Sequence, residues 1–296
     1  MAEPETSGQV SLLRQAALAV SVLDDVDLEP RTSGVLLTGP RGVLVRWAVL
    51  RRVLAGAEPD DPAGRRRLST FLRLRRLVME LGAQAPAVLE SSARALALPV
   101  GHVDHLGPGW VAETVLGGDL DAGVGVLGLL GDPDEVVPLH PGVAAAAGTD
   151  VRWWWERLAG HVDAMGALAA HRLARDAGAG RQSVLRPVGG CEVLTLLVSP
   201  TLRRYLADED GSGMRALAVP MRSRGWYDLA RIDPAFVGAA WSATPEVERG
   251  VPRPLLVTAD EVRIATVAPH AAAAALAAAL ADPVVDPPTM RDVRYR

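Results

Sequence analysis

The chain has 296 residues and a formal net charge of −4, and all 31 of its basic residues other than histidine are arginine. Because lysine is absent, Walker P-loop enzymes, protein kinases and Schiff-base enzymes are excluded in their standard forms. The negative net charge gives no overall attraction to nucleic acid, so a nucleic-acid partner is not expected. The single cysteine, Cys191, excludes an internal disulfide and a cysteine-rich zinc site.

The composition predicts an ordered protein that works in the cytoplasm. Hydrophobic residues make up 49% of the chain and charged residues 22%, which is typical of globular domains. Asparagine and lysine are absent together while Ala, Gly, Arg and Pro are abundant, which indicates a GC-rich bacterial genome. Selection against lysine modification is the alternative explanation. The first residues, MAEPETSGQV, do not resemble a signal peptide, and no apolar run approaches the ~18 residues of a membrane span.

The N-terminal part is expected to combine helices with one β-hairpin. The sequence GVLLTGPRG, residues 34–42, resembles the opening of an AAA-type Walker A loop, but Val43, Leu44 and Val45 stand where that motif has Gly-Lys-Thr. The residues instead predict two strands, Val35–Thr38 and Val43–Trp47, joined by a Gly-Pro-Arg-Gly turn. Apolar periodicity, capping residues and prolines predict helices over 9–23, 48–55, 62–82 and 86–98.

The C-terminal part is expected to begin with an irregular segment. Residues 99–148 are rich in Gly and Pro, which indicates either a loop-rich binding region or a boundary between two units. The segment 191–198 fits a helix or a strand. Helices are predicted over 150–177, 200–208, 234–242 and 270–281, a strand over Met214–Met221, and a hairpin from Pro254–Val257 and Val262–Val267.

These elements predict a mixed α/β (α+β) fold that is rich in helix and has short antiparallel hairpins near both ends. Two domains are expected, 1–98 with the hairpin and its helices and 99–296 with the Gly/Pro-rich segment, the long helix and a C-terminal α/β part. A single domain over 8–282 is the alternative.

The loop His102-Val103-Asp104-His105 is the best candidate for a metal site. Imidazole and carboxylate groups ligate divalent ions such as Zn²⁺, and close spacing lets one loop wrap an ion. The loop resembles the end of the metallo-β-lactamase signature His-x-His-x-Asp-His, whose first histidine would fall at Val100. The alternative is a polar loop in which these side chains bond to nearby backbone groups.

Cys191 and His161 are the weak candidates for a catalytic role. Cys191 follows two glycines and precedes an apolar segment, whose helix dipole would favour a thiolate if the segment is helical. A cysteine nucleophile needs a histidine base, for which His140, His161 and His270 are available. Otherwise Cys191 and His161 are core residues.

Aromatic and arginine residues indicate a binding surface. Consecutive residues on a helix diverge by ~100°, so Trp154 can face the core while Trp153 or Trp155 faces elsewhere. Arg222, Arg224 and Trp226 fall in an expected loop after a strand, where functional residues are common. A further set of arginines lies on one side of the 62–82 helix and could grip an acidic partner, a nucleotide or RNA: Arg65, Arg66, Arg73 and Arg76.

Three functions remain after these exclusions. The first is a cytoplasmic binding or assembly protein that acts through protein contacts and self-association and needs no cofactor. The second is a metal-assisted hydrolase that uses the His-x-Asp-His loop. The third is a binder of nucleotides or phosphorylated small molecules that uses Arg222, Arg224 and Trp226. The sequence favours the first because no convergent catalytic set is evident.

Overall fold

A computed structural model describes residues 7–39, 41–115, 118–180, 184–209, 211–227 and 232–264. The described residues fall in one compact unit that ends at Ile264. The helix expected over 270–281, with His270, lies outside the described residues. Among the helices that the structure describes, none combines the length and the apolar character needed to cross a membrane.

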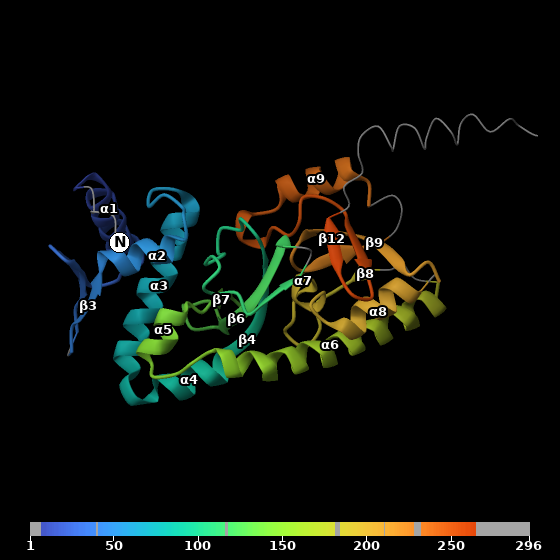
Figure 1. Ribbon diagram of the computed structural model, residues 1–296, viewed down its shortest axis with the longest axis horizontal. Helices are drawn as coiled ribbons and strands as arrows, with labels where there is room; N and C mark the ends of the chain where they lie inside the picture. The colour runs from blue at the N-terminus through green and yellow to red at the C-terminus, as the bar shows by residue number, and fades with distance from the viewer. Residues whose placement is uncertain are drawn as a thin grey trace, which may run out of the picture. The chain divides into compact units, whose positions relative to one another are not determined.

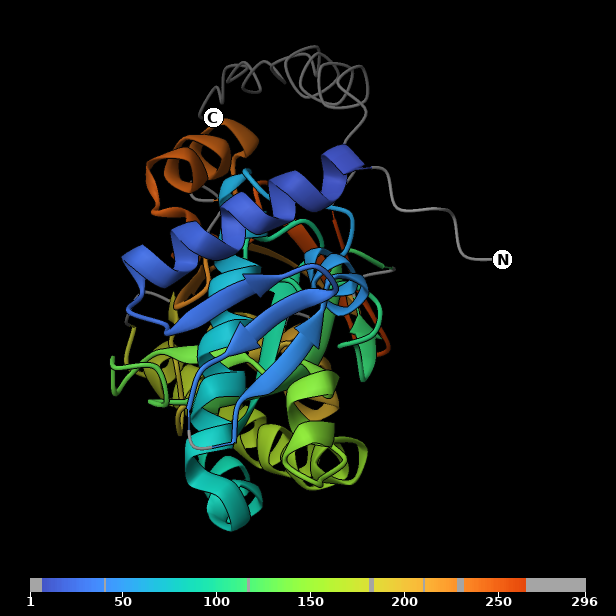
Figure 2. The ribbon, with the colours of Figure 1, turned by 90° about the vertical axis from the view of Figure 1, so that its left-hand side faces the viewer.

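The N-terminal segment forms the predicted helix and hairpin and adds one strand. Helix α1 (Ser7–Leu23) is followed by three antiparallel strands in the order β1-β2-β3 and by helix α2 (Trp47–Leu54). Figure 2 shows α1 running beside the three strands. The strands are β1 (Leu28–Arg31), β2 (Gly34–Leu37) and β3 (Val43–Arg46). The β2–β3 pair confirms the predicted hairpin, so the Walker-like segment is not a phosphate-binding loop before a helix.

Helix α3 (Pro62–Leu81) confirms the predicted helix over 62–82. Pro62 occupies its first turn, and Gly82 ends it with a φ of 54°, a conformation that favours glycine. The helix predicted over 86–98 was wrong in its second half. Helix α4 (Ala85–Ser92) stops there, and the chain continues as strand β4 (Ala93–Pro99).

The Gly/Pro-rich segment contributes strands to a central sheet. Strand β6 pairs with β4 from Ala93 to Pro99, so this sheet joins residues on both sides of position 98. The other edge of β6 is shared by β5 and β7. The elements of this segment are β5 (Glu113–Val115), β6 (Leu120–Leu127), β7 (Val136–Pro138) and the short helix α5 (Pro141–Ala146).

The C-terminal helices confirm the predicted ones where the chain is described. Ser199 and Asp233 cap their helices through side-chain oxygens that accept backbone N–H groups, and a proline follows each cap. The segment 191–198 contains a helix rather than a strand. The helices are α6 (Arg152–Gly178), α7 (Val193–Leu196), α8 (Pro200–Asp208) and α9 (Pro234–Ala243).

A five-stranded antiparallel sheet completes the described chain, in the order β12-β11-β9-β10-β8. The predicted strand over Met214–Met221 is confirmed, and so is the predicted hairpin between β11 and β12 as far as Ile264, while its residues 265–267 lie outside the described residues. The strands are β8 (Val184–Leu185), β9 (Met214–Met221), β10 (Arg224–Trp226), β11 (Leu255–Thr258) and β12 (Val262–Ile264). The fold is therefore mixed α/β, with antiparallel hairpins towards both ends (Figure 1).

Two large hydrophobic cores lie in this unit. One is built around α1–α4 and includes Trp47, Phe71 and Trp154. The other is built around α6–α8 and the C-terminal sheet and includes Val162 and Cys191. Helix α6 and the strands β4 and β6 contribute residues to both cores, so the same elements support the two halves of the unit.

Candidate functional site: an arginine groove beside the N-terminal sheet

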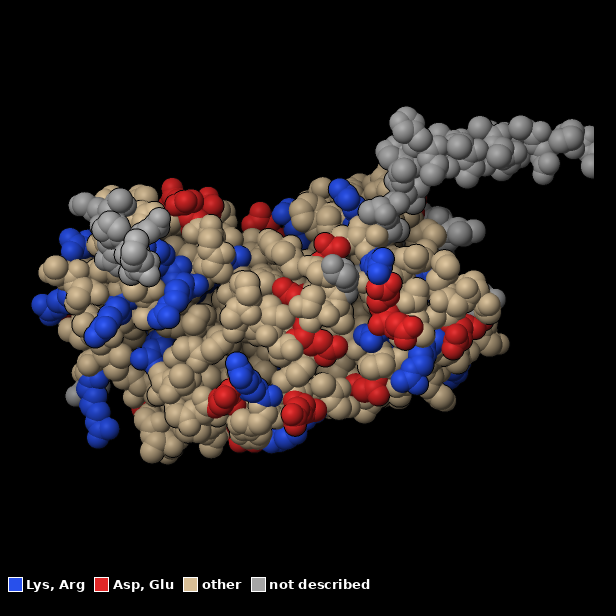
Figure 3. Space-filling model, in the orientation of Figure 1, with Lys and Arg blue, Asp and Glu red and all other residues tan. Residues whose placement is uncertain are grey.

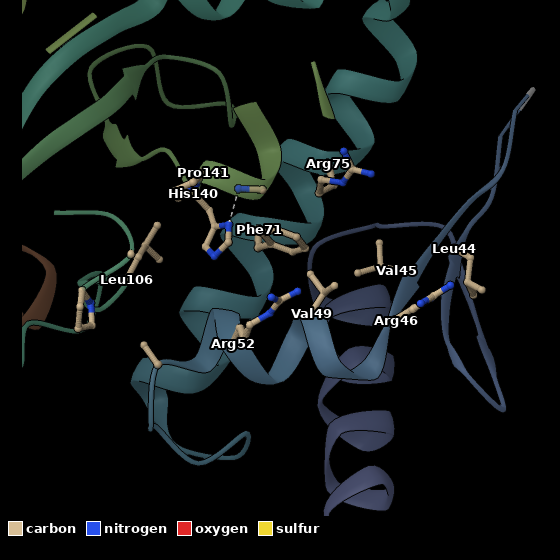
Figure 4. Close-up of a pocket in the computed structure, with 14 residues that line it drawn as sticks. Leu44, Val45, Arg46, Val49, Arg52, Phe71, Arg75, Leu106, His140 and Pro141 are labelled. Atoms are coloured by element: carbon tan, nitrogen blue, oxygen red, sulfur yellow. Dashed lines mark hydrogen bonds between the residues drawn. The ribbon is translucent and has the colours of Figure 1, made fainter. Parts of the chain in front are cut away.

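A groove of about 680 Å³ lies beside the N-terminal sheet. This volume is in the range of ligand-binding clefts. Its walls come from β3, α2, α3, the loop 106–109 and the start of α5, which are brought together from separate parts of the sequence. Figure 4 shows these walls and the side chains between them. We call it the arginine groove because of the three arginines described below.

The floor of the arginine groove is apolar and uncharged. The Phe71 ring is 2% exposed and meets the His140 ring edge to face, with 5.1 Å between the ring centroids (Figure 4). Nδ1 of His140 accepts a hydrogen bond of 2.9 Å from the backbone N–H of Gly142. Burial, together with the positive charge of Arg52, lowers the pKa of His140 to about 4. The imidazole is therefore neutral at physiological pH.

Arg46, Arg52 and Arg75 supply the charge of the groove. Each comes from a different element, respectively β3, α2 and α3. Within the described part of the chain, their guanidinium groups make no hydrogen bond or ion pair. Burial lowers the pKa of Arg75, and no acidic group opposes this effect. Three cations without anionic partners among the described residues, beside an apolar floor, can attract a ligand that is both acidic and apolar.

The arginine groove lies in a basic part of the surface. Figure 3 shows arginines gathered on the side of the molecule where Figure 1 places β3 and α1–α3. The sequence carries a signal for this patch, because residues 41–57 contain four arginines and no acidic residue. Sequence reasoning missed Arg46, Arg52 and Arg75 and selected other arginines of α3 instead.

Three of the four arginines selected from the sequence have partners in the structure. Arg66 forms ion pairs with Asp104 and with Glu135, the latter at 2.8 Å. Arg73 donates to the carbonyl of Leu130. A third, Arg76, pairs with Glu80 at 2.8 Å, and Arg65 is exposed. Arg76 also donates to the backbone carbonyl of Asp25 at 2.8 Å, so each of these three arginines holds α3 to another segment of the chain.

The His-x-Asp-His loop is buried, and His105 and Asp104 are bonded to other protein groups, whereas Nε2 of His102 has no hydrogen-bond partner among the described residues. Nδ1 of His105 accepts from the N–H of Gly107 at 3.0 Å, so its Nε2 donates to Asp121, at 2.9 Å. Thr114 donates to the other oxygen of Asp121 at 2.7 Å. Burial lowers the pKa of His105, although Asp121 opposes this shift. Both ring nitrogens are thus occupied by protein groups.

His102, at the start of the loop, also has a pKa below its ordinary value. Its Nδ1 accepts from the backbone N–H of Asp104 at 3.1 Å. Burial, and then the charges of Arg222 and Arg66, lower its pKa to about 3, against a weaker opposing effect from the Val247 carbonyl. No group of three His, Cys, Asp or Glu residues in the described ranges could hold a metal ion. The ion pair between Asp104 and Arg66 supports a structural role, in which the loop is held to α3.

Cys191 and His161 line one cavity of about 320 Å³ together with Arg94. Burial raises the pKa of the Cys191 thiol to about 11 although Arg94 opposes the shift. Nε2 of His161 lies 3.4 Å from the carbonyl oxygen of Gly189. No hydrogen bond joins this thiol to this imidazole, although both residues are described. The surroundings therefore favour a protonated thiol and do not provide it with a base.

The arginine and tryptophan residues expected at a binding surface differ in their burial and in their interaction partners. Arg222 is 7% exposed and forms an ion pair of 2.7 Å with Glu192. The Arg224 guanidinium lies 5.9 Å from the centroid of the Trp226 ring. Trp153 is 46% exposed, whereas Trp155 is half-buried and packs against both cores. None of these five residues lines the arginine groove, and sequence position alone does not separate the buried ones from the exposed ones.

Comparison with models of protein families, with curated proteins and with solved structures finds no match to this chain.

Proposed function

We propose that the chain is a binding protein that takes an acidic, partly apolar segment of a partner protein into the arginine groove. The proposal rests on one observation. Arg46, Arg52 and Arg75 line the same groove as the buried ring of Phe71, and none of the three has an anionic partner in the described chain. Guanidinium groups bind carboxylates through paired hydrogen bonds, and Val49 and Pro141, which line the groove and are only half-buried, can contact side chains such as leucine.

A protein segment fits the groove better than a nucleic acid does. Proteins that hold single strands stack bases on accessible aromatic rings, but the aromatic ring here is 2% exposed. Because the groove carries three positive charges, two copies of the chain would repel each other if their grooves met, so we propose a partner other than this chain.

The proposal is tested with a fluorescein-labelled (Glu-Leu)₄ peptide, whose binding is followed by fluorescence anisotropy. Exposed ion pairs contribute ~0.2–1 kcal/mol each, so replacing three arginines removes about 0.6–3 kcal/mol and weakens binding by about threefold to 150-fold. We expect this loss in the triple variant R46Q/R52Q/R75Q, and we expect (Lys-Leu)₄ not to bind. A matched control, R172Q/R175Q/R253Q, changes the net charge equally through exposed arginines outside the groove.

Several outcomes would contradict the proposal. Equal loss in the two triple variants would show that only net charge matters. Comparable binding of (Lys-Leu)₄ would show that the groove does not select acidic segments. ATP or single-stranded RNA is also added as a competitor. If either displaces the labelled peptide at a lower concentration than unlabelled peptide does, the ligand is a nucleotide or a nucleic acid and the proposal is wrong.

A further inference from the structure

We infer that the acidic segment binds in an extended conformation, as a fourth strand added to the outer edge of β3. This inference rests on the proposed function and specifies how the partner is held. Addition of a strand supplies affinity through backbone hydrogen bonds, while side chains that alternate along the strand supply selectivity.

The outer edge of β3 has unpaired backbone groups. In the order β1-β2-β3, strand β3 pairs on one side only among the strands of the described residues. The N–H of Trp47 bonds to the carbonyl of Ser33, and groups alternate along an antiparallel strand, so Val45 and Val43 also face β2. The N–H and C=O of Leu44 and the N–H of Arg46 therefore point away from β2. In the described chain they bond to no other residue.

The other edge of the sheet is protected, and the edge of β3 is not. Strand β1 carries Glu29, Pro30 and Arg31, and charge and proline at an edge oppose the pairing of another strand. Strand β3 instead presents Val43, Leu44 and Val45 before its single charge, and Leu44 is 45% exposed. Of the two edges, β3 is thus the one that can accept a strand.

The edge of β3 is also a wall of the arginine groove. Leu44, Val45 and Arg46 line the groove on this strand, with Arg52 and Arg75 on the walls next to it (Figure 4). A strand added there would present every second side chain to the groove. Acidic side chains among them would meet the three guanidinium groups, which is the charge complementarity that identifies an acidic segment as the occupant.

The inference is tested with two further forms of the (Glu-Leu)₄ peptide, N-methylated at every leucine or at every glutamate. In a strand, the N–H groups of alternate residues point to opposite edges, so each form blocks one edge only. We expect one form to lose at least about tenfold in affinity and the other to change by less than about threefold. Equal effects of the two forms would overturn strand addition.

Two variants of the protein give a second test. L44P removes the outward N–H while the bonds of Val43 and Val45 to β2 remain, and L44A removes the side chain but keeps the N–H. We expect L44P to weaken binding about tenfold and L44A to weaken it less than about threefold. Peptide binding should also slow hydrogen exchange at the amides of Leu44 and Arg46, which NMR detects residue by residue.

The outcomes separate the two proposals. If the unmodified peptide binds through the three arginines but exchange at Leu44 and Arg46 stays fast, strand addition is wrong and the binding function stands. If the unmodified peptide does not bind at all, the proposed function itself fails. A third outcome is measured by light scattering. If the chain forms dimers, if R46Q increases the dimer fraction, and if the peptide dissociates the dimers, the strand at this edge comes from a second copy and the proposed partner is wrong.

Discussion

Two arginines on α3, Arg66 and Arg75, have opposite electrostatic surroundings. Arg66 pairs with Asp104 and Glu135, which lie 38 and 69 residues further along the chain. Arg75 lines the arginine groove and has no acidic partner in the described residues. Sequence spacing separates the faces of a helix, but it does not show which charges distant loops bring to each face. The candidate site gathers arginines for which the described residues supply no acidic partner.

His102 gives a testable consequence at the residue scale. The folded protein holds its pKa at about 3, well below the 6.5 of an unfolded chain. The unfolded state therefore binds more protons between about pH 3 and 6.5. The stability that depends on neutral His102 is complete above pH 6.5 and is lost progressively as the pH falls towards 3.

We expect the variant H102N to lose this part of the pH dependence, because its side-chain oxygen can accept from the Asp104 N–H but takes up no proton. Between pH 7.5 and 5, its free energy of unfolding should fall by about 1–2 kcal/mol less than that of the wild type. Urea unfolding followed by tryptophan fluorescence measures the difference. The exposed His171 provides the control, H171N. A wild-type pH dependence in H102N would show that the His102 imidazole is not held neutral.

At the scale of elements, local signals predicted the helices better than the central sheet. Ser199 and Asp233, each followed by proline, cap α8 and α9 as expected, since capping depends only on neighbouring residues. The segment 93–98 reads Ala-Arg-Ala-Leu-Ala-Leu, which favours a helix by propensity. It forms β4 because β6 pairs along its whole length and buries it, and tertiary context overrides weak local preference.

Gly64 in α3 and Gly160 in α6 differ in how closely other segments pack against them. A Cβ atom at Gly64 in α3 would overlap the carbonyl oxygen of Glu58, whereas one at Gly160 in α6 would meet no atom within 4 Å. We expect G64A to destabilise the protein by about 1–3 kcal/mol through overpacking and G160A to stabilise it by about 0.5–1 kcal/mol. Urea unfolding of both variants measures these effects. A stabilised G64A would contradict the close packing of α3 on the 58–61 turn.

At the scale of the whole described unit, the two large cores share α6. This helix places Trp154 in the first core and Val162 and Leu173 in the second. Trp155 and Leu158, between them in the sequence, pack against both cores. Because one rigid helix and the central sheet serve both cores, the loss of one core removes support from the other.

Cys191 allows this coupling to be measured, because it is buried in the second core at 4% exposure. We expect its reaction with a thiol reagent in rising urea to show the same midpoint as the fluorescence change, to which Trp47 and Trp154 of the first core contribute. Without urea, burial and the high pKa should keep the thiol unreactive. Reaction at a clearly lower urea concentration would show that the second core opens independently.

The sequence by itself determined the fold class, the hairpin at 35–47, the long helices and the chemistry that a lysine-free chain excludes. These features depend on neighbouring residues, on periodicity and on composition, all of which are local. Only the tertiary structure decided that residues 93–99 form a strand, that the His-x-Asp-His loop is bonded internally, and that Arg46, Arg52 and Arg75 meet around Phe71. Each of these depends on contacts between segments far apart in the chain, and a single sequence does not record which segments meet.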